Sequence, residues 1–159
     1  MILKFLKLRQ IIINFSNRLS LKAKLLSQIK IVNTLYYSFK FGHSILKPVL
    51  IFYRGTTYKI HQTAKIIFNS NAKLYLNKSW CDINPFKTLF LMREDAQLVV
   101  KGQFAFLCGS SIYINKGATL ELGSGFCNCN GSISCFEHIT IGEGVLISEQ
   151  VLIRDSDDH

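Results

Sequence analysis

Polar side chains suited to proton transfer lie in two short segments near the end of the chain. The first contains Asn128, Cys129 and Asn130, and the second, RDSDDH, ends at His159. A histidine with a pKa of about 6.5 is largely neutral at pH 7, so it can accept a proton from a hydroxyl group and pass it on. An amide such as that of Asn128 can donate to and accept from a hydroxyl group, which fixes the oxygen that reacts. Together the two segments can act on an alcohol if the fold brings them close.

Three aspartates, Asp155, Asp157 and Asp158, lie just before this histidine. A carboxylate beside His159 would hold its ring in one tautomer and raise its pKa. The same aspartates could instead bind a divalent cation, but the glycine and the closing glutamate of an EF-hand loop are absent. His138 and His159 alone do not make a zinc site. We therefore expect no metal site.

Aliphatic pairs recur along the second part of the chain, mostly at intervals of six residues. Corner-forming residues such as Gly, Asn and Ser separate them. Six is the period of neither a helix nor a hairpin, and short strands at this spacing indicate a solenoid whose stacked coils share one core. The longest interruption, WCDINPFKTLFLMRED at residues 80–95, predicts an excursion from the repeat. The pairs are Ala64 and Ile66, Ala72 and Leu74, Leu98 and Val100, Phe104 and Phe106, Ile112 and Ile114, Ala118 and Leu120, Cys127 and Cys129, Ile133 and Cys135, Ile139 and Ile141, Val145 and Ile147, and Val151 and Ile153.

Residues 1–55 are predicted to form basic amphipathic helices. The chain has a formal net charge of +9, and its first acidic residue is Asp82. Such helices can lie on an anionic membrane surface, or their apolar stripes can pack on the following domain or on a neighbouring subunit. No run approaches the ~20 apolar residues needed to span a bilayer, and no nucleic-acid-binding motif accompanies the basic residues. The stripes are Phe5, Leu8, Ile12, Phe15 and Leu19, followed after a cap at Ser20 by Leu21, Leu25, Ile29, Val32 and Tyr36.

The chain contains five cysteines, an odd number, and shows no cleavable secretory signal. Reduced thiols in a cytoplasm fit this pattern better than a disulfide framework. Cys127 and Cys129 are too close in sequence for the usual zinc loop. We interpret the cysteines as small core residues, which argues against a cysteine nucleophile.

The best-formed repeats, ITIGEGVLISEQVLI, resemble the hexapeptide repeat of left-handed parallel β-helix acyltransferases. That repeat combines an aliphatic residue, a small or acidic residue, two variable positions, a small residue and one more variable position. Residues 141–146 satisfy it fully, and residues 147–152 depart only at Ser148. The resemblance covers residues 56–159 and implies a mainly β fold. The fold it implies is a left-handed parallel β-helix of about five coils, preceded by the N-terminal amphipathic helices.

The segments GFCNCNGSI and IRDSDDH narrow the resemblance. They look like those of the galactoside and maltose acetyltransferase group of sugar O-acetyltransferases, and of related acyltransferases of surface-polysaccharide synthesis. Those proteins carry an N-x-N segment before a histidine that follows a broken repeat. The resemblance implies transfer of an acetyl group to a sugar hydroxyl from acetyl-CoA, a co-substrate rather than a permanently bound cofactor. By the same resemblance His159 is the general base and Asn128 and Asn130 bind substrate, while the longer last loop leaves the acceptor open.

In the resembled family three subunits pack side by side, so we expect a homotrimer with donor and glycan acceptor in the groove between neighbours. We also expect a cytoplasmic protein, with membrane contact at the inner face through the N-terminal helices and no nucleic-acid partner. Further coils follow the histidine in those enzymes, and no cap follows Ile153 here. We therefore expect a chain that is incomplete at its C-terminus and weakly active or inactive at this length.

Other interpretations of the sequence stay open. The protein could be a noncatalytic β-helix scaffold or a basic peripheral membrane-binding protein. Asn128 and Asn130 could form an asparagine ladder at a coil corner, and His159 could be a solvated residue.

Overall fold

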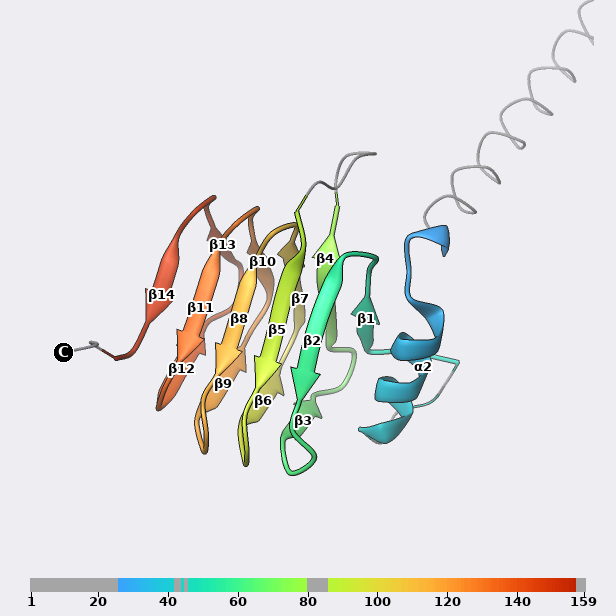
Figure 1. Ribbon diagram of the computed structural model, residues 1–159, viewed down its shortest axis with the longest axis horizontal. Helices are drawn as coiled ribbons and strands as arrows, with labels where there is room; N and C mark the ends of the chain where they lie inside the picture. Colours follow the sequence, from blue (N-terminus) through green and yellow to red (C-terminus); the bar gives the residue numbers. More distant parts are fainter. Residues whose placement is uncertain (1–25, 42–43, 45, 80–85, 157–159) are drawn as a thin grey trace, which may run out of the picture.

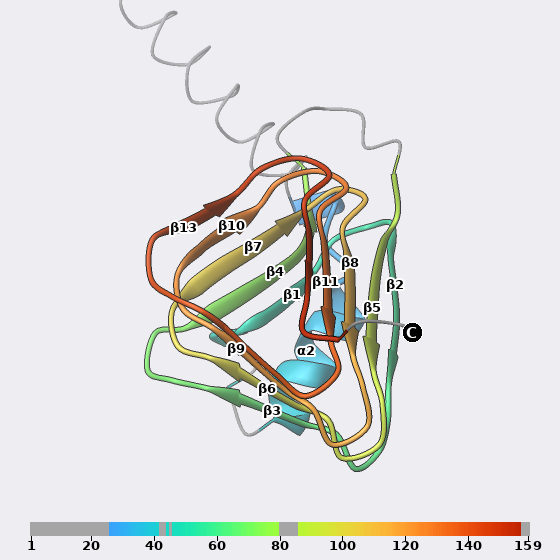
Figure 2. The same ribbon diagram turned by 90° about the vertical axis from the view of Figure 1, so that its left-hand side faces the viewer.

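A computed structural model describes residues 26–41, 44, 46–79 and 86–156 (Figure 1). Strands dominate this part of the chain, and every pairing between them within the three sheets is parallel. The chain visits the sheets in turn, so every third strand is a hydrogen-bonded neighbour. Seen from the end formed by the last strand, Leu152–Arg154 (β14), the strands enclose a three-sided column (Figure 2). This mainly β arrangement is compatible with a parallel β-helix, and its two five-stranded sheets agree with the predicted number of coils.

The three sheets contain five, five and four strands. The first sheet contains β1 (Leu50–Phe52), β4 (Lys73–Lys78), β7 (Gln103–Leu107), β10 (Gly125–Cys127) and β13 (Val145–Ile147). The second contains β2 (Thr56–Ile60), β5 (Thr88–Met92), β8 (Ser111–Ile114), β11 (Ser132–Cys135) and β14 (Leu152–Arg154). The third contains β3 (Lys65–Phe68), β6 (Gln97–Val100), β9 (Thr119–Leu122) and β12 (His138–Ile141).

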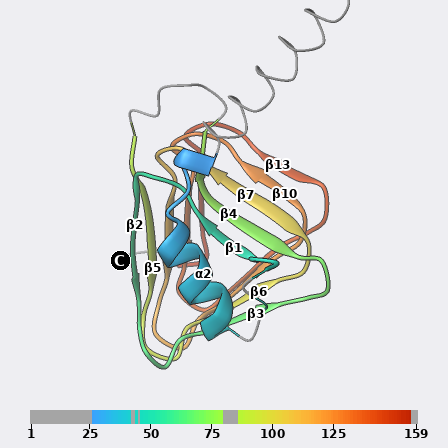
Figure 3. The ribbon, with the colours of Figure 1, turned by 90° about the vertical axis from the view of Figure 1, so that its right-hand side faces the viewer.

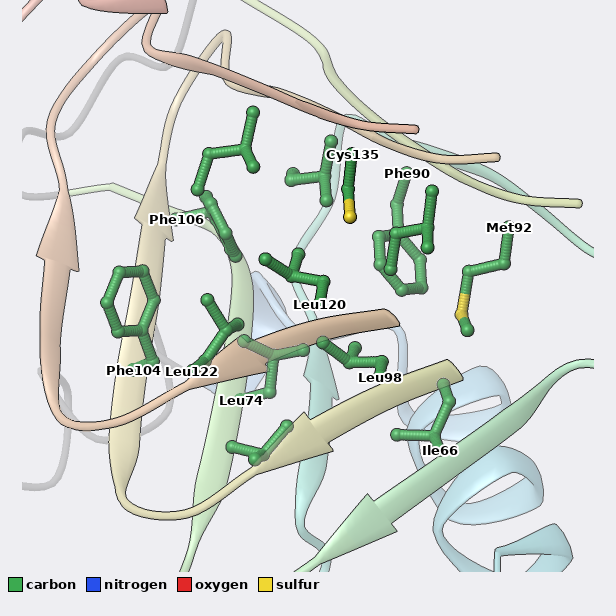
Figure 4. Packing of buried hydrophobic residues seen from close by; sticks show 14 of the residues in the cluster. Ile66, Leu74, Phe90, Met92, Leu98, Phe104, Phe106, Leu120, Leu122 and Cys135 are labelled. Carbon is green, nitrogen blue, oxygen red and sulfur yellow. The ribbon is translucent and has the colours of Figure 1, made fainter. Parts of the chain in front are cut away.

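Alternate residues of each strand point into one continuous core (Figure 4). In-register pairing stacks these residues into columns, because equivalent positions of successive coils lie opposite one another. One such column is formed by Ile66, Leu98 and Leu120, all nearly inaccessible to solvent. Burial of each such side chain stabilises the fold by about 1.5–3 kcal/mol. The sequence pairs from Ala64 to Ile147 thus supply this core, except that Cys129 and Val145 are only partly buried.

The interruption expected at residues 80–95 is wrong in its second half. Thr88–Met92 form β5, which pairs in register with β2 and β8, and Phe90 and Met92 are buried in the core. The strand escaped detection because its apolar residues follow Pro85 and polar residues rather than a regular corner. Residues 80–85 lie outside the described residues.

Helix α2 (Ile31–Lys40) covers one end of the column (Figure 3). Hydroxyl groups on its buried side accept hydrogen bonds from the edge of β1. Thr34 Oγ1 accepts from the Phe52 N–H at 3.1 Å, and Ser38 Oγ accepts from the N–H groups of Val49 and Leu50 at 3.2 and 3.4 Å. An exposed strand edge carries unpaired backbone groups, and these contacts supply partners for it.

Of the alternatives for the apolar stripe of this helix, packing on the following domain is wrong for Val32 and Tyr36. Val32 and Tyr36 are 79% and 58% exposed, whereas Thr34 and Ser38 are buried. Ile29 lies outside the helix and forms an isolated antiparallel bridge with Tyr53. The earlier stripe from Phe5 to Leu19, together with Ser20, Leu21 and Leu25, lies outside the described residues.

The opposite end of the column is formed by β12, β13 and β14. There Leu146 and Leu152 are 69% and 61% exposed, and the last predicted pair, Val151 and Ile153, is exposed and half-buried respectively. Within the described ranges, no helix combines the length and apolar character needed to cross a membrane.

Candidate functional site

The two asparagines predicted to bind substrate lie at the corner between β10 and β11. Asn128 directly follows β10 and is half-buried, while Asn130 is exposed. His159, the predicted base, lies outside the described residues, as do Asp157 and Asp158. The structure therefore places one half of the predicted site and gives no distance to the other.

The Asn128 side chain makes a local hydrogen bond. Its Oδ1 accepts from the Cys129 N–H at 2.8 Å, while the Asn128 backbone N–H donates to the Ile147 carbonyl of the next coil at 2.9 Å. The first bond orients the side chain, and the second holds the Asn128 backbone at the corner. Among the described residues no partner is found for its amide NH2 group, which is thus a donor that a ligand could use.

The Asn130 side chain packs over a glycine of the preceding coil. A Cβ atom at Gly109 would overlap the Asn130 Oδ1 atom. Asn130 has a φ of 57°, in the left-handed region, and donates its N–H to the Cys108 carbonyl at 3.0 Å. The same arrangement of asparagine over glycine occurs two coils earlier, where Asn77 lies over Gly55. Asn130 therefore has a structural role at a coil corner.

Asp155 connects the last described coil to the one before it. Its carboxylate accepts hydrogen bonds from the N–H groups of Phe136, Glu137 and His138 at 2.6, 2.8 and 2.7 Å. Desolvation by itself would raise the pKa of Asp155, but these backbone hydrogen bonds outweigh it and lower the pKa below its usual value. Backbone N–H groups thus occupy three of the roughly four acceptor positions of this carboxylate, which gives Asp155 a structural role between the two coils.

Three of the cysteines are buried, as predicted: Cys108, Cys127 and Cys135. Burial raises the pKa of the Cys127 thiol to about 11, and burial together with the nearby Asp155 carboxylate raises that of Cys135 to about 11. Thiols with such pKa values are protonated near neutral pH and are poor nucleophiles. Cys129 is half-buried, with its sulfur 3.0 Å from that of Cys108.

A groove of about 420 Å³ lies on the outer face of the first sheet. Tyr75, Ala105 and Phe126 line it in register from successive coils, and the Lys78 ammonium lies 5.1 Å from the centre of the Tyr75 ring. Leu146 continues the same outward column on β13. These residues occupy outward positions, which the hexapeptide pattern leaves variable, so the pattern alone does not single them out. The available signal was that this outward position stays apolar in successive coils.

The groove and the Asn128 corner are connected through β10, since Phe126 lies two residues before Asn128. The groove offers an apolar floor with one cation, and the corner offers an amide donor. Within the described part of the chain, no group of three or more His, Cys, Asp or Glu side chains is placed to hold a metal ion. No model of a known protein family, no curated protein and no solved structure matches this chain.

Proposed function

We propose that the chain is an acyl-CoA-dependent O-acyltransferase that moves an acetyl group from acetyl-CoA to a sugar hydroxyl in surface-polysaccharide synthesis. The observation that carries the proposal is the stack of three parallel sheets visited in strict rotation. That architecture is the one that the hexapeptide-repeat resemblance implies. In the proposal the column is the left-handed β-helix of that family.

His159 is the general base of the proposed reaction. Its neutral imidazole accepts the proton of the sugar hydroxyl as that oxygen attacks the thioester carbonyl, and the proton then passes to the departing thiolate. Asn128 donates its amide N–H to the acceptor sugar and so selects the hydroxyl that reacts. No permanently bound cofactor takes part.

The working form in this proposal is a homotrimer. The outer face of the first sheet supports it, because Tyr75, Ala105, Phe126 and Leu146 make a column that is apolar in four successive coils. Apolar outer faces of this kind are suited to packing against a neighbouring subunit. The groove over this column would then lie at the junction between subunits, where the resembled enzymes bring donor and acceptor together.

Acetyl transfer from acetyl-CoA to a panel of sugars tests the proposal. His159→Ala should lower the rate by about 10² to 10⁴ while the unfolding temperature stays unchanged. Asn128→Ala should alter the kinetics of the acceptor and leave those of acetyl-CoA unchanged. Asn69→Ala, at an exposed asparagine that follows β3, is the matched control. A His159→Ala protein that retains half of the parent activity would overturn the assignment of the base.

A noncatalytic scaffold is the second candidate function. It is favoured by the structural roles of Asn130 and Asp155, whose side chains pack within the coil stack. A scaffold would assemble through the same apolar face but would neither transfer an acetyl group nor hydrolyse acetyl-CoA. The assay described above therefore separates the two functions.

A further inference from the structure

Helix α2 presents a wide apolar face to solvent. Ile31, Val32, Tyr36 and Phe39 are 55%, 79%, 58% and 66% exposed and define what we call the α2 outer face. The spacing of Val32, Tyr36 and Phe39, by four and three residues, puts them on one side of the helix, opposite the hydroxyl groups that cap β1, and Ile31 adds to this surface at the first helical residue. Single exposed apolar residues are ordinary on a protein surface, but four on one ten-residue helix mark an interaction surface.

The outer face lies at one end of the molecule. Figure 3 looks onto this end and shows α2 in front of the strands that it covers. The buried side of the helix is already fixed by the Thr34 and Ser38 hydrogen bonds to β1. The helix is thus held in place by contacts within the described residues, and its outer face is exposed.

Positive charge is concentrated at the same end. Residues 26–79 contain eight lysines and arginines and no aspartate or glutamate, whereas residues 86–156 contain five cations and seven acids. Lys40 ends α2 and is exposed, with its ammonium group 5.8 and 5.7 Å from the ring centres of Tyr37 and Phe41. The α2 outer face therefore carries the exposed Lys40 at its C-terminal end and belongs to a part of the chain, residues 26–79, that has cations and no acids.

An apolar face in a positively charged part of the chain favours some binding partners over others. A second copy of the chain would bring its own cations against these, so like-charge repulsion opposes self-association through the α2 outer face. An anionic bilayer complements both properties, because its headgroups attract the lysines and its acyl boundary accepts the apolar side chains. Aromatic residues such as Tyr36 and Phe39 are well suited to that boundary.

We propose that the α2 outer face docks the protein on an anionic lipid bilayer, with the acid-bearing end of the column directed away from it. The contact is interfacial, since the helix lies on the bilayer and is not long enough to cross it. The proposal concerns where the protein works and stands apart from the transfer activity.

Sedimentation of the full chain with lipid vesicles tests the proposal. Phosphatidylcholine vesicles with phosphatidylglycerol should bind the protein, those without it should bind much less, and added salt should weaken the binding. Replacing Val32 and Phe39 together with serine should lower the affinity about tenfold or more, because two large apolar side chains no longer enter the boundary. Lys40→Glu should weaken binding to the anionic vesicles alone. Leu152→Ser, which removes a 61% exposed leucine at the other end, should bind like the parent.

Circular dichroism and thermal unfolding confirm that each variant is folded. Three outcomes would overturn the proposal. The double variant could bind like the parent, which would assign the contact to another segment such as residues 1–25. The parent could bind both kinds of vesicle equally, or the double variant could change the oligomeric state in the absence of lipid, which would make the face an interface between copies.

Discussion

The two ends of the column keep backbone donors satisfied in different ways. At the α2 end, neutral hydroxyl groups of Thr34 and Ser38 accept hydrogen bonds from buried N–H groups of the first strand. At the β14 end, the charged carboxylate of Asp155 accepts three N–H groups from the coil before it. Both devices attach a terminal element to the stack. Because only the second device depends on ionisation, acid should loosen the two ends differently.

The ends also differ in how closely their backbones pack. At the α2 end, backbone hydrogen bonds join Lys30 to Phe52 and Arg54 to Gln28 just before the helix, and the helix itself reaches β1 through its side chains. At the β14 end the coil containing β10 touches the coil containing β13 directly. A Cβ atom at Gly125 would overlap the Val145 carbonyl oxygen, and Gly125 has a φ of 138°. The last coil therefore relies on a glycine, and the helix cap relies on hydroxyl groups.

Among the substitutions at the two ends, Gly125→Ala is expected to lower the free energy of unfolding most. The added methyl group must displace the Val145 carbonyl and the backbone must hold a strained φ, so we expect a loss on the order of 4 kcal/mol in the free energy of unfolding. Gly142→Ala is the matched control, since its Cβ would meet only a Val145 methyl group at 4.0 Å and its φ is ordinary. Denaturant unfolding measures both. Equal stability of the two variants would show that the close contact between β10 and β13 is not needed.

A smaller effect is expected when the cap at the α2 end is broken. Ser38→Ala leaves the buried N–H groups of Val49 and Leu50 without their acceptor, which costs about 1–3 kcal/mol. Thr34→Val should cost a similar amount through Phe52. Ser44→Ala is the control, because Ser44 is exposed and its hydroxyl accepts from the exposed N–H of Leu46. Its cost should stay within about 0.5 kcal/mol. Amide hydrogen exchange should locate the loss at β1, and an unchanged exchange rate there would contradict the role of the hydroxyl groups.

The core could be predicted from sequence because strand burial follows a local alternation. Pairs such as Ile112 and Ile114 predict which face of a strand points inward even when the neighbouring strands are unknown. Both residues are fully buried. The orientation of α2 could not be predicted in the same way. The rule that apolar helix residues point inward fails where the buried neighbour is a strand edge that needs acceptors. Thr34 and Ser38 face inward for that reason, and only the position of β1 reveals it.

The candidate site was predicted only in part for a similar reason. Asn128 could be singled out from its motif, but the role of Asp155 depends on register between coils. Asp155 directly follows β14, and the pairing of β14 with β11 brings the Asp155 carboxylate to the N–H groups of residues 136–138. Spacing along the sequence alone places Asp155 near His159 and gives no sign of this contact. The groove at Tyr75 and Phe126 likewise becomes visible only when outward positions of different coils are stacked.

The smallest expected change in stability is the one caused by acid. It should affect the β14 end and leave the α2 end unchanged. The folded-state pKa of Asp155 lies below its unfolded value of about 3.9, so its stabilising contribution is present above that pH. It is lost as pH falls through the folded-state value, because the protonated carboxyl accepts the backbone N–H groups less well. We expect a local loss of about 1 kcal/mol, since the carboxylate is only half-buried. In a pH titration followed by NMR, the amide signals of Phe136 and His138 should shift below about pH 4 while those of Val49 and Leu50 stay constant. Asp155→Asn should abolish this acid-dependent shift. If the amides at both ends moved together, or if Asp155→Asn titrated like the parent, the contrast between a charged and a neutral cap would be wrong.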